Sequence, residues 1–381
     1  MLLIIDRYLL RQFLQVFAIC FVSLTGLYVV FDAFTNLDEF LRYADQNGRL
    51  MQVMAEFYAY RSVLFFDRMG AMLAMVAGMF TLTWFQRHNE LVALMAAGIS
   101  RRRVIVPVIV ASIVISLASA ASRELVIPSL REDLSRDARE LVGDTAVEFH
   151  PRYDHTTDIR FNGRALYTRE RRISQPNFLL PVGLDQHGKQ LSAEDAFYQP
   201  ADASIGRPSG YLFRGVTQPK ELLAASSLSL GERRVLITPA DAPAWLKPGE
   251  CFVASDVSFE QLAGGKRWRQ LSSTVELIGG LHNPSLEPGA DVSVLVHSRL
   301  VQPLLDMTLV FLGLPLVLRR ENRNMFLAIG LCMGLVISFI GVVELCKIIG
   351  EIYLVPASLA AWLPLMIFGP MAVAMYDTID P

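Results

Sequence analysis

The sequence predicts an α-helical polytopic membrane protein with six transmembrane helices and an inserted extracytoplasmic β-jelly-roll (all-β) domain. This class follows from the composition, from long apolar runs, and from a change of pattern in the middle of the chain. The 381 residues are 52% hydrophobic and only 19% charged, which is typical of a chain that lies partly in lipid. The net charge of -2 gives no basic surface for nucleic acid, so no nucleic-acid partner is expected.

Six apolar runs, each bounded by charged residues, are long enough to cross a bilayer. A helix rises about 1.5 Å per residue and the hydrocarbon core is about 30 Å thick, so about 20 residues span it. The predicted spans are roughly 12–31, 62–85, 104–122, 300–318, 325–343 and 352–376. The first run is longer than the apolar core of a signal peptide and lacks a small-residue cleavage site after it, so we expect it to remain as a span.

Arginine residues in the short connections predict the orientation of the chain. They precede the first span, separate the second from the third, and separate the fourth from the fifth: Arg7, Arg11, Arg87, Arg101, Arg102, Arg103, Arg319, Arg320 and Arg323. Alternating spans place all of them on one side, and the positive-inside rule makes that side the cytoplasm. We therefore expect both termini in the cytoplasm and the long insert on the opposite side of the membrane.

The insert between the third and fourth spans has the pattern of an all-β domain. Residues 127–142 show helical amphipathic spacing, which predicts that the third span continues out of the membrane. Asn162-Gly163 then stands between two alternating segments, a strong signal for a β-hairpin, and short β-branched and aromatic segments follow. Such strands favour an antiparallel sandwich or jelly roll. The predicted domains are residues 1–128 with three spans, 129–295 with the β domain, and 296–381 with three spans.

The sequence contains no motif of nucleotide, cofactor or metal chemistry. Walker A, HExxH and GxSxG patterns do not occur, and the four cysteines are too scattered for a disulfide framework or a CxxC site. No cofactor is therefore expected. His150, Asp154, His155 and Asp158 could ligate a metal ion, but they lie in a turn-rich segment, which favours a solvated loop.

Ionisable residues in or beside the spans are candidate functional residues, because a charge placed in lipid is costly and usually faces a cavity or a partner. Asp306 lies about two turns inside the fourth span, where a functional role and a packing role with a satisfying partner both stay open. Glu344 and Lys347 are three residues apart and can pair on one helix. Asp32, Asp67 and Arg68 lie near the outer ends of the first two spans.

A short segment between the second and third spans, QRHNELVALMAAGISRRR, predicts a cytoplasmic helix near 89–98. Asn89 is expected to cap its N-terminus, Glu90 lies in the first turn, where the helix dipole favours a carboxylate, and Gly98 suits the C-terminal cap. Its apolar residues include Leu91, Leu94 and Met95. Two interpretations stay open: an interfacial helix anchored to anionic lipid by the following arginines, or a docking helix for a cytoplasmic partner.

The same segment resembles the coupling segment of the LptF/LptG family of lipopolysaccharide-export permeases, in which a Glu, a Leu/Ala-rich turn and Ala-Gly-Ile-Ser recur between the second and third spans. Further motifs resemble the family in the same order: Arg123-Glu124 with Pro128, His297-Ser-Arg299 with Pro303, Gly313 with Pro315, and Leu359-Ala-Ala-Trp362-Leu-Pro364. The resemblance extends over all six spans and the position of the insert.

This resemblance implies the non-catalytic permease subunit of an ABC transporter that extracts lipopolysaccharide or a related lipid from the inner membrane. The implied partners are a cytoplasmic ABC ATPase dimer, a second permease subunit, homologous or identical, and periplasmic bridge proteins with a β-jelly-roll fold. Glu90 would engage the ATPase, and spans one and five would form a lateral gate. The other implied coupling residues are Leu91, Leu94, Gly98 and Arg101.

Candidate residues of the substrate cavity or gate are Asp32, Arg42, Asp306 and Glu344. Family members tend to carry basic residues near the outer end of the first span, whereas this chain has Asp32 there and Arg42 farther out, so a less anionic lipid or a modified lipopolysaccharide stays open. Two other classes also stay open. One is a membrane-anchored scaffold or sensor with a ligand-binding β domain, and the other is an intramembrane enzyme using Asp306 with Glu344 or the histidine cluster.

Overall fold

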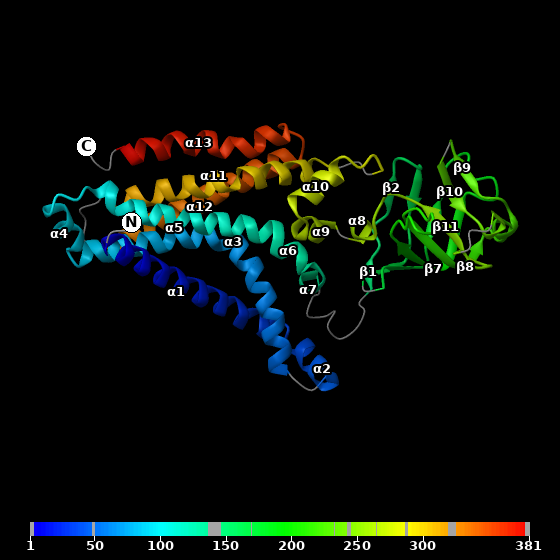
Figure 1. Cartoon of the computed structure of the whole chain (residues 1–381), viewed down its shortest axis with the longest axis horizontal. Helices are drawn as coiled ribbons and strands as arrows, with labels where there is room; N and C mark the ends of the chain where they lie inside the picture. The colour runs from blue at the N-terminus through cyan, green and yellow to red at the C-terminus, as the bar shows by residue number, and fades with distance from the viewer. Residues whose placement is uncertain are drawn as a thin grey trace. The chain divides into compact units, whose positions relative to one another are not determined.

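The structure, a computed structural model, divides into two compact units, Met1–Leu134 with Gly289–Pro381 and Ser135–Pro288. The first is a bundle of helices and the second is built on a β-sheet (Figure 1). The residues that the structure describes are 4–47, 50–135, 146–168, 170–231, 233–241, 245–263, 265–285, 289–318 and 325–377.

In the described part of the chain, six helices are long and apolar enough to cross a membrane. They are α1 (Ile4–Thr35), α3 (Leu50–Arg87), α5 (Arg101–Ala121), α11 (Ala290–Leu318), α12 (Met325–Glu351) and α13 (Ala357–Asp377). The six predicted spans are thereby confirmed. Most of these helices are longer than the apolar run that predicts them, because a helix can continue with polar residues through the headgroup layer.

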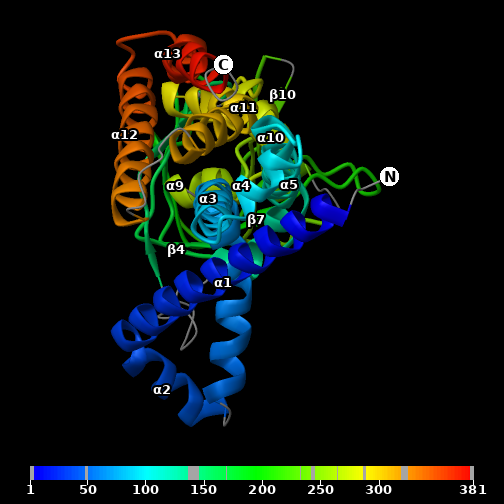
Figure 2. The ribbon, with the colours of Figure 1, turned by 90° about the vertical axis from the view of Figure 1, so that its left-hand side faces the viewer.

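Shorter helical segments connect or extend the long helices. Outside the insert they are α2 (Leu37–Asn47), α4 (Glu90–Ala96), α6 (Ile127–Ser129), α7 (Arg131–Ser135) and the π-helical segment η1 (Ser122–Val126). The third span therefore continues through η1 and α6 into α7, as predicted up to residue 135, and residues 136–142 of the predicted helix lie outside the described residues. Figure 2 shows α1, α2 and the first part of α3 extending away from the other helices.

The core of the bundle forms where α3 packs against α1, α5 and α11. Glycines let these helices approach closely: a Cβ on Gly78 would lie 3.0 Å from side-chain carbons of Leu314 and Val108, and one on Gly313 would lie 2.9 Å from Met75. Small residues at helix contacts are the usual way in which membrane helices gain packing contacts in lipid. These glycines therefore bring α3 to the centre of the bundle.

In the second unit the described strands form an 11-stranded sheet in the order β1-β4-β5-β7-β8-β11-β10-β9, with β2, β3 and β6 off this path. All the strand pairs are antiparallel. The strands are β1 (Val147–Glu148), β2 (Arg152–Asp154), β3 (Ile159–Phe161), β4 (Ala165–Tyr167), β5 (Arg172–Ser174), β6 (Asn177–Leu179), β7 (Gln190–Gln199), β8 (Gly210–Gln218), β9 (Leu228–Leu230), β10 (Arg233–Ile237) and β11 (Cys251–Ala254). The predicted all-β insert is thereby confirmed.

Aromatic side chains fill the core of this unit. Phe178 lies in edge-on contact with Tyr211 and Phe213, and Phe161 packs beside it with ring centroids 4.6 Å apart. Helical segments flank the sheet in sequence: η3 (Lys220–Ala224), η4 (Pro239–Asp241), α8 (Phe259–Ala263), α9 (Gly265–Leu271) and α10 (Thr274–Leu281). The alternation of buried and exposed residues in β3 and β7 fits a sheet with one apolar face.

The hairpin predicted at Asn162-Gly163 is wrong. These residues join β3 to β4, but β3 pairs with β2 and β6, whereas β4 pairs with β1 and β5. Neither residue has the positive φ that a type I′ turn requires. Instead, the Asn162 carbonyl accepts a hydrogen bond from Asn177 N–H at 2.8 Å, and the Asn162 side chain accepts one from Gly163 N–H at 2.9 Å.

Asp154 is a buried anchor of the sheet, so the interpretation as a solvated loop is wrong for this residue. Its carboxylate accepts hydrogen bonds from Ser255 Oγ at 2.6 Å and from the N–H groups of Thr156 and Thr157 at 3.0 and 3.3 Å. Asp158 is engaged separately, by the Tyr153 hydroxyl. Among the described residues no group of three or more potential ligands is placed to hold a metal ion.

Removing this anchor gives a first expected result. We expect Asp154→Ala to destabilise the sheet unit by about 2–4 kcal/mol, because two backbone amides and a buried hydroxyl lose their acceptor. Hydrogen exchange of the β11 amides in the full-length protein in nanodiscs measures the loss. Ser255→Ala, which removes one of the bonds, should cost about 1 kcal/mol. Unchanged β11 protection in Asp154→Ala would contradict the anchoring role.

Candidate functional site

The short helix α4 lies at the end of the bundle where α3 ends and α5 begins, which we call the α4 end (Figure 1). The prediction that Asn89 caps it is wrong: Asn89 has a left-handed backbone, with φ 59° and ψ 12°, and its side chain makes no capping hydrogen bond. A capping residue needs an extended backbone to aim its side chain at the first free amides. Asn89 contributes its carbonyl instead, which accepts from Ala93 N–H at 3.1 Å.

Gly98 terminates α4, as predicted. It follows the C-cap residue Ala97 with a φ of 82°, a left-handed conformation that glycine adopts without strain. Its N–H donates to the Met95 carbonyl at 2.9 Å, and the Ile99 N–H donates to the Leu94 carbonyl at 3.0 Å. These two bonds make a Schellman motif, which stops the helix and turns the chain toward α5.

The two sides of α4 differ in burial. Leu91 is buried in the core of the bundle and Leu94 packs partly against it. Val92 is 61% exposed and Met95 is also exposed on the outer side. Glu90, half-buried in the first turn, makes no hydrogen bond or ion pair with any residue that the structure describes. The helix is thus fixed to the bundle through Leu91 and Leu94, offers apolar side chains on its outer side, and carries the half-buried carboxylate of Glu90 at its start.

The arginines after α4 contact other residues of the same chain. Arg103 forms an ion pair with Asp6 of α1 at 2.9 Å, and Arg102 donates to the Asp377 carbonyl at the end of α13 at 3.4 Å. Arg101 Nε donates to Met95 Sδ at 3.5 Å. These contacts tie α5 to the first and last helices of the chain, α1 and α13, and to α4, so they support a fixed joint more than an anchor that holds only lipid.

Asp306 is 7% exposed and has two partners inside the bundle. Ser116 Oγ of α5 donates to one carboxylate oxygen at 2.7 Å, and Gln302 Nε2 donates to the other at 2.8 Å. This arrangement supports the packing role. Glu344 instead pairs with Lys347 on α12 at 2.7 Å, which confirms that predicted pairing. The two carboxylates thus have separate partners, and no described contact joins them as an intramembrane enzyme would require.

An ion pair inside the bundle was missed by sequence reasoning. Arg123 of η1 binds Asp67 of α3 at 2.9 Å, and their side chains are only 16% and 13% exposed. Arg299 of α11 and Glu124 lie within electrostatic range of this pair. A π-helical segment shifts the side chains that follow it, and such segments occur often at functional sites. The sequence feature that could have predicted this ion pair is the presence of opposite charges at the same expected depth in two spans.

The other candidate cavity residues lie near the end of α1 that is farthest from α4. Asp32 is half-buried and accepts a hydrogen bond from the Tyr58 hydroxyl of α3 at 2.9 Å. Arg42 is exposed on α2. The described contacts therefore place Asp32 with Tyr58 and Asp306 with Ser116, and they do not gather the four predicted cavity residues into one site.

A bundle of helices that can span a membrane, an inserted β domain and a short helix fixed between the second and third spans define a multi-pass membrane protein. Residues 7–172 and 272–377 match the family described as lipopolysaccharide export system permease LptF/LptG, which is most of the chain. The chain therefore belongs to the LptF/LptG family, is a multi-pass inner-membrane protein and is a permease for lipopolysaccharide export. No curated protein matches the chain.

Proposed function

We propose that the chain is the permease subunit of an ABC transporter that extracts lipopolysaccharide or a related lipid from the inner membrane and passes it to a periplasmic bridge. The observation that carries this proposal is α4, which is anchored by Leu91 and offers Glu90 without a partner among the described residues. A docked ATPase would supply the basic residue and the apolar groove that this surface lacks. Leu94, Gly98 and Arg101 would hold the helix in its docked shape.

The orientation in this proposal follows from the arginines at the α4 end. Their side of the membrane is the cytoplasm by the positive-inside rule, so an ABC ATPase dimer docks there, both termini are cytoplasmic and the β domain of residues 129–295 is periplasmic. The β domain then offers sheet edges to bridge proteins with a β-jelly-roll fold. ATP-driven closure of the ATPase dimer would move α4 and narrow the cavity between paired permease subunits.

A second permease subunit, homologous or identical, is part of the proposal because α1 is poorly covered within one chain. Val22 and Phe31 of α1 are each 67% exposed, and few residues of this helix are buried. α1 packs on α3 and α5, while α12 packs chiefly on α11 and α13. A lateral gate made by spans one and five therefore fits best between two subunits, with lipid entering between their exposed faces.

The proposed substrate is a lipid with a glycan or phosphate headgroup. The residues at the outer end of α1 bear on the charge of that headgroup. Asp32 is bound to Tyr58 there, and the first turn of α2 adds Asp38 and Glu39. Arg61 of α3 adds a cation at the same end, where its guanidinium donates to the Tyr28 hydroxyl of α1 at 3.5 Å. This end thus carries both signs of charge, and the proposal includes both phosphorylated and less anionic or modified lipopolysaccharide.

Co-purification tests the proposal. The permease, reconstituted in nanodiscs with candidate ATPase subunits, should retain an ATPase and a lipid A species detectable by mass spectrometry. ATP should then release that lipid to a soluble β-jelly-roll acceptor, and a non-hydrolysable ATP analogue should not. A permease that binds a ligand through its β domain but moves no lipid with ATP would instead be the scaffold or sensor.

A further inference from the structure

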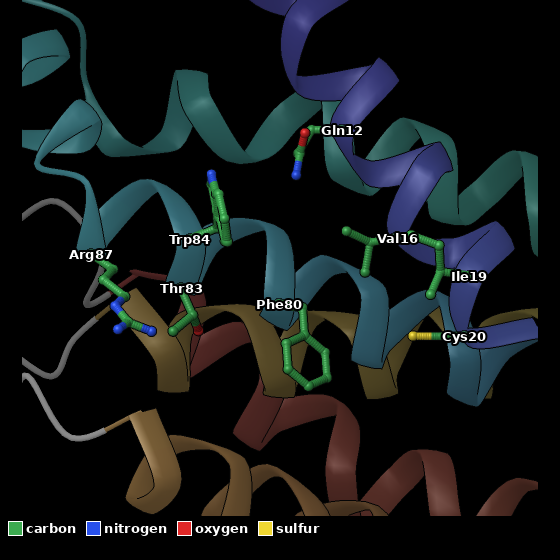
Figure 3. Close-up of a pocket in the computed structure, with 8 residues that line it drawn as sticks. All are labelled: Gln12, Val16, Ile19, Cys20, Phe80, Thr83, Trp84 and Arg87. Atoms are coloured by element: carbon green, nitrogen blue, oxygen red, sulfur yellow. The ribbon is translucent and has the colours of Figure 1, made fainter. Parts of the chain in front are cut away.

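A cavity of about 320 Å³ lies between α1 and α3 in the half of the bundle next to α4. Figure 3 shows Gln12 and Val16 of α1 on one side, and Phe80, Thr83, Trp84 and Arg87 of α3 along the other. Arg87 is the last residue of α3, so the cavity reaches from the apolar level of the membrane to its surface. It is separated along both helices from Asp32 and Asp67, which lie toward the opposite face.

The polar side chains that line this cavity make no hydrogen bonds with the residues that the structure describes. Thr83 Oγ1 is buried without any hydrogen bond, whereas Thr81 on the same helix donates to the Ala77 carbonyl at 2.8 Å. The side chains of Gln12, Trp84 and Arg87 likewise make no hydrogen bond with a residue that the structure describes. Unpaired donors at membrane depth are costly because lipid tails cannot accept hydrogen bonds.

The chemistry of the four polar side chains determines which class of ligand the cavity can bind. All four can donate hydrogen bonds, Arg87 carries a positive charge, and none of the described residues that line the cavity is acidic. The ligand must therefore present several acceptor oxygens with negative charge at the Arg87 end and an apolar chain toward Val16 and Phe80. Basic pockets between membrane helices on the cytoplasmic side commonly bind lipid headgroups, and tryptophan prefers this same level.

We propose that this cavity binds an anionic phospholipid of the leaflet next to α4, with its phosphate at Arg87 and Trp84 and an acyl chain along Val16 and Phe80. Naming that leaflet as the cytoplasmic one rests on the proposed orientation. The bound lipid is not the exported substrate, whose headgroup the proposed function places at the outer end of α1, toward the opposite face. It has a route to the coupling helix α4, because the Trp84 ring packs against the His88 ring in a tilted arrangement, with centroids 4.3 Å apart, just before α4.

Cys20 gives a direct readout, because it lines the cavity and is half-buried, while Cys251, Cys332 and Cys346 are buried. Purified full-length permease, delipidated in detergent and without ATPase, is labelled with a maleimide. Dioleoyl phosphatidylglycerol should slow labelling of Cys20, and dioleoyl phosphatidylcholine should do so much less. Arg87→Gln should weaken this protection about fivefold, the effect of one arginine on an anionic headgroup at a membrane surface.

Arg11→Gln is the matched control, because Arg11 is an exposed arginine of α1 at the same membrane face and does not line the cavity. It should leave the protection unchanged, and Thr83→Val should reduce it. Equal protection by the two lipids would overturn the proposal in favour of unspecific annular lipid. Protection by glycerol phosphate alone would show a free-anion site, and protection on adding a second permease subunit without lipid would show a subunit interface. Export is not measured, so failure here leaves the proposed function untouched.

Discussion

Glu90→Lys is expected to abolish co-purification of the cytoplasmic ATPase and to stop lipid export, while the permease itself stays folded. The substitution replaces the carboxylate at the start of α4 with a cation that would face the partner's basic residue. Losing one member of a buried charge pair at an interface costs about 2–5 kcal/mol, and charge reversal adds repulsion. Pull-down of the ATPase from nanodiscs and an export assay in cells measure the two effects.

The fold should not change because Glu90 makes no hydrogen bond or ion pair with a described residue, so its replacement should alter stability by less than about 1 kcal/mol. Glu351→Lys is the matched control: Glu351 is exposed at the last residue of α12, has no role in the proposed site, and receives the same change of charge. Glu90→Gln should give an intermediate loss. A Glu90→Lys permease that retains the ATPase at the wild-type level would remove α4 from the coupling mechanism.

The outer face of α4 also shows why the sequence could place this helix but could not orient it. Leu91, Val92, Leu94 and Met95 are equally apolar in the sequence, yet Leu91 is buried and Val92 is exposed. That division depends on how α4 rotates against the bundle, which no local pattern records. Gly98 was predictable because a left-handed residue at a helix end is a local requirement that glycine meets.

The membrane spans were predictable for the same reason, since the length of an apolar run and its flanking arginines are local properties. Pairing between strands that lie far apart in the sequence was not predictable. Asn162-Gly163 has the composition of a hairpin turn, but Phe161 and Ala165 pair with other strands because the sheet as a whole places them there. Tertiary pairing thus outweighed a strong local turn signal.

The buried polar contacts of the bundle were likewise not predictable from local sequence. Asp306 was a candidate because a carboxylate in a span is rare, but its partner Ser116 lies 190 residues away in an apolar run. Asp67 and Arg123 were visible as charges near two spans, and only the helix packing and the π-helical segment bring them to 2.9 Å. Charges can be located from sequence, whereas their partners follow from helix rotation.

Breaking that ion pair should give the largest loss of stability in the bundle. We expect Arg123→Leu to lower the free energy of unfolding by about 3–5 kcal/mol, because it leaves the Asp67 carboxylate buried without its cation. Arg299 lies within electrostatic range of the pair, so the loss should fall at the lower end of this range. Unfolding of the purified permease in mixed micelles, followed by tryptophan fluorescence, measures the change.

A double-mutant cycle separates the charge pair from simple packing. Asp67→Leu alone should destabilise the bundle by a similar amount, because it leaves the largely buried Arg123 without its ion-pair partner and beside the like charge of Arg299. The double variant should recover most of the loss, since apolar pairs of similar volume often replace buried ion pairs at little cost. Additive losses in the double variant would mean that each side chain packs independently. Recovery of stability without recovery of export would show that the pair also serves transport, because an apolar replacement keeps the packing and removes only the charges.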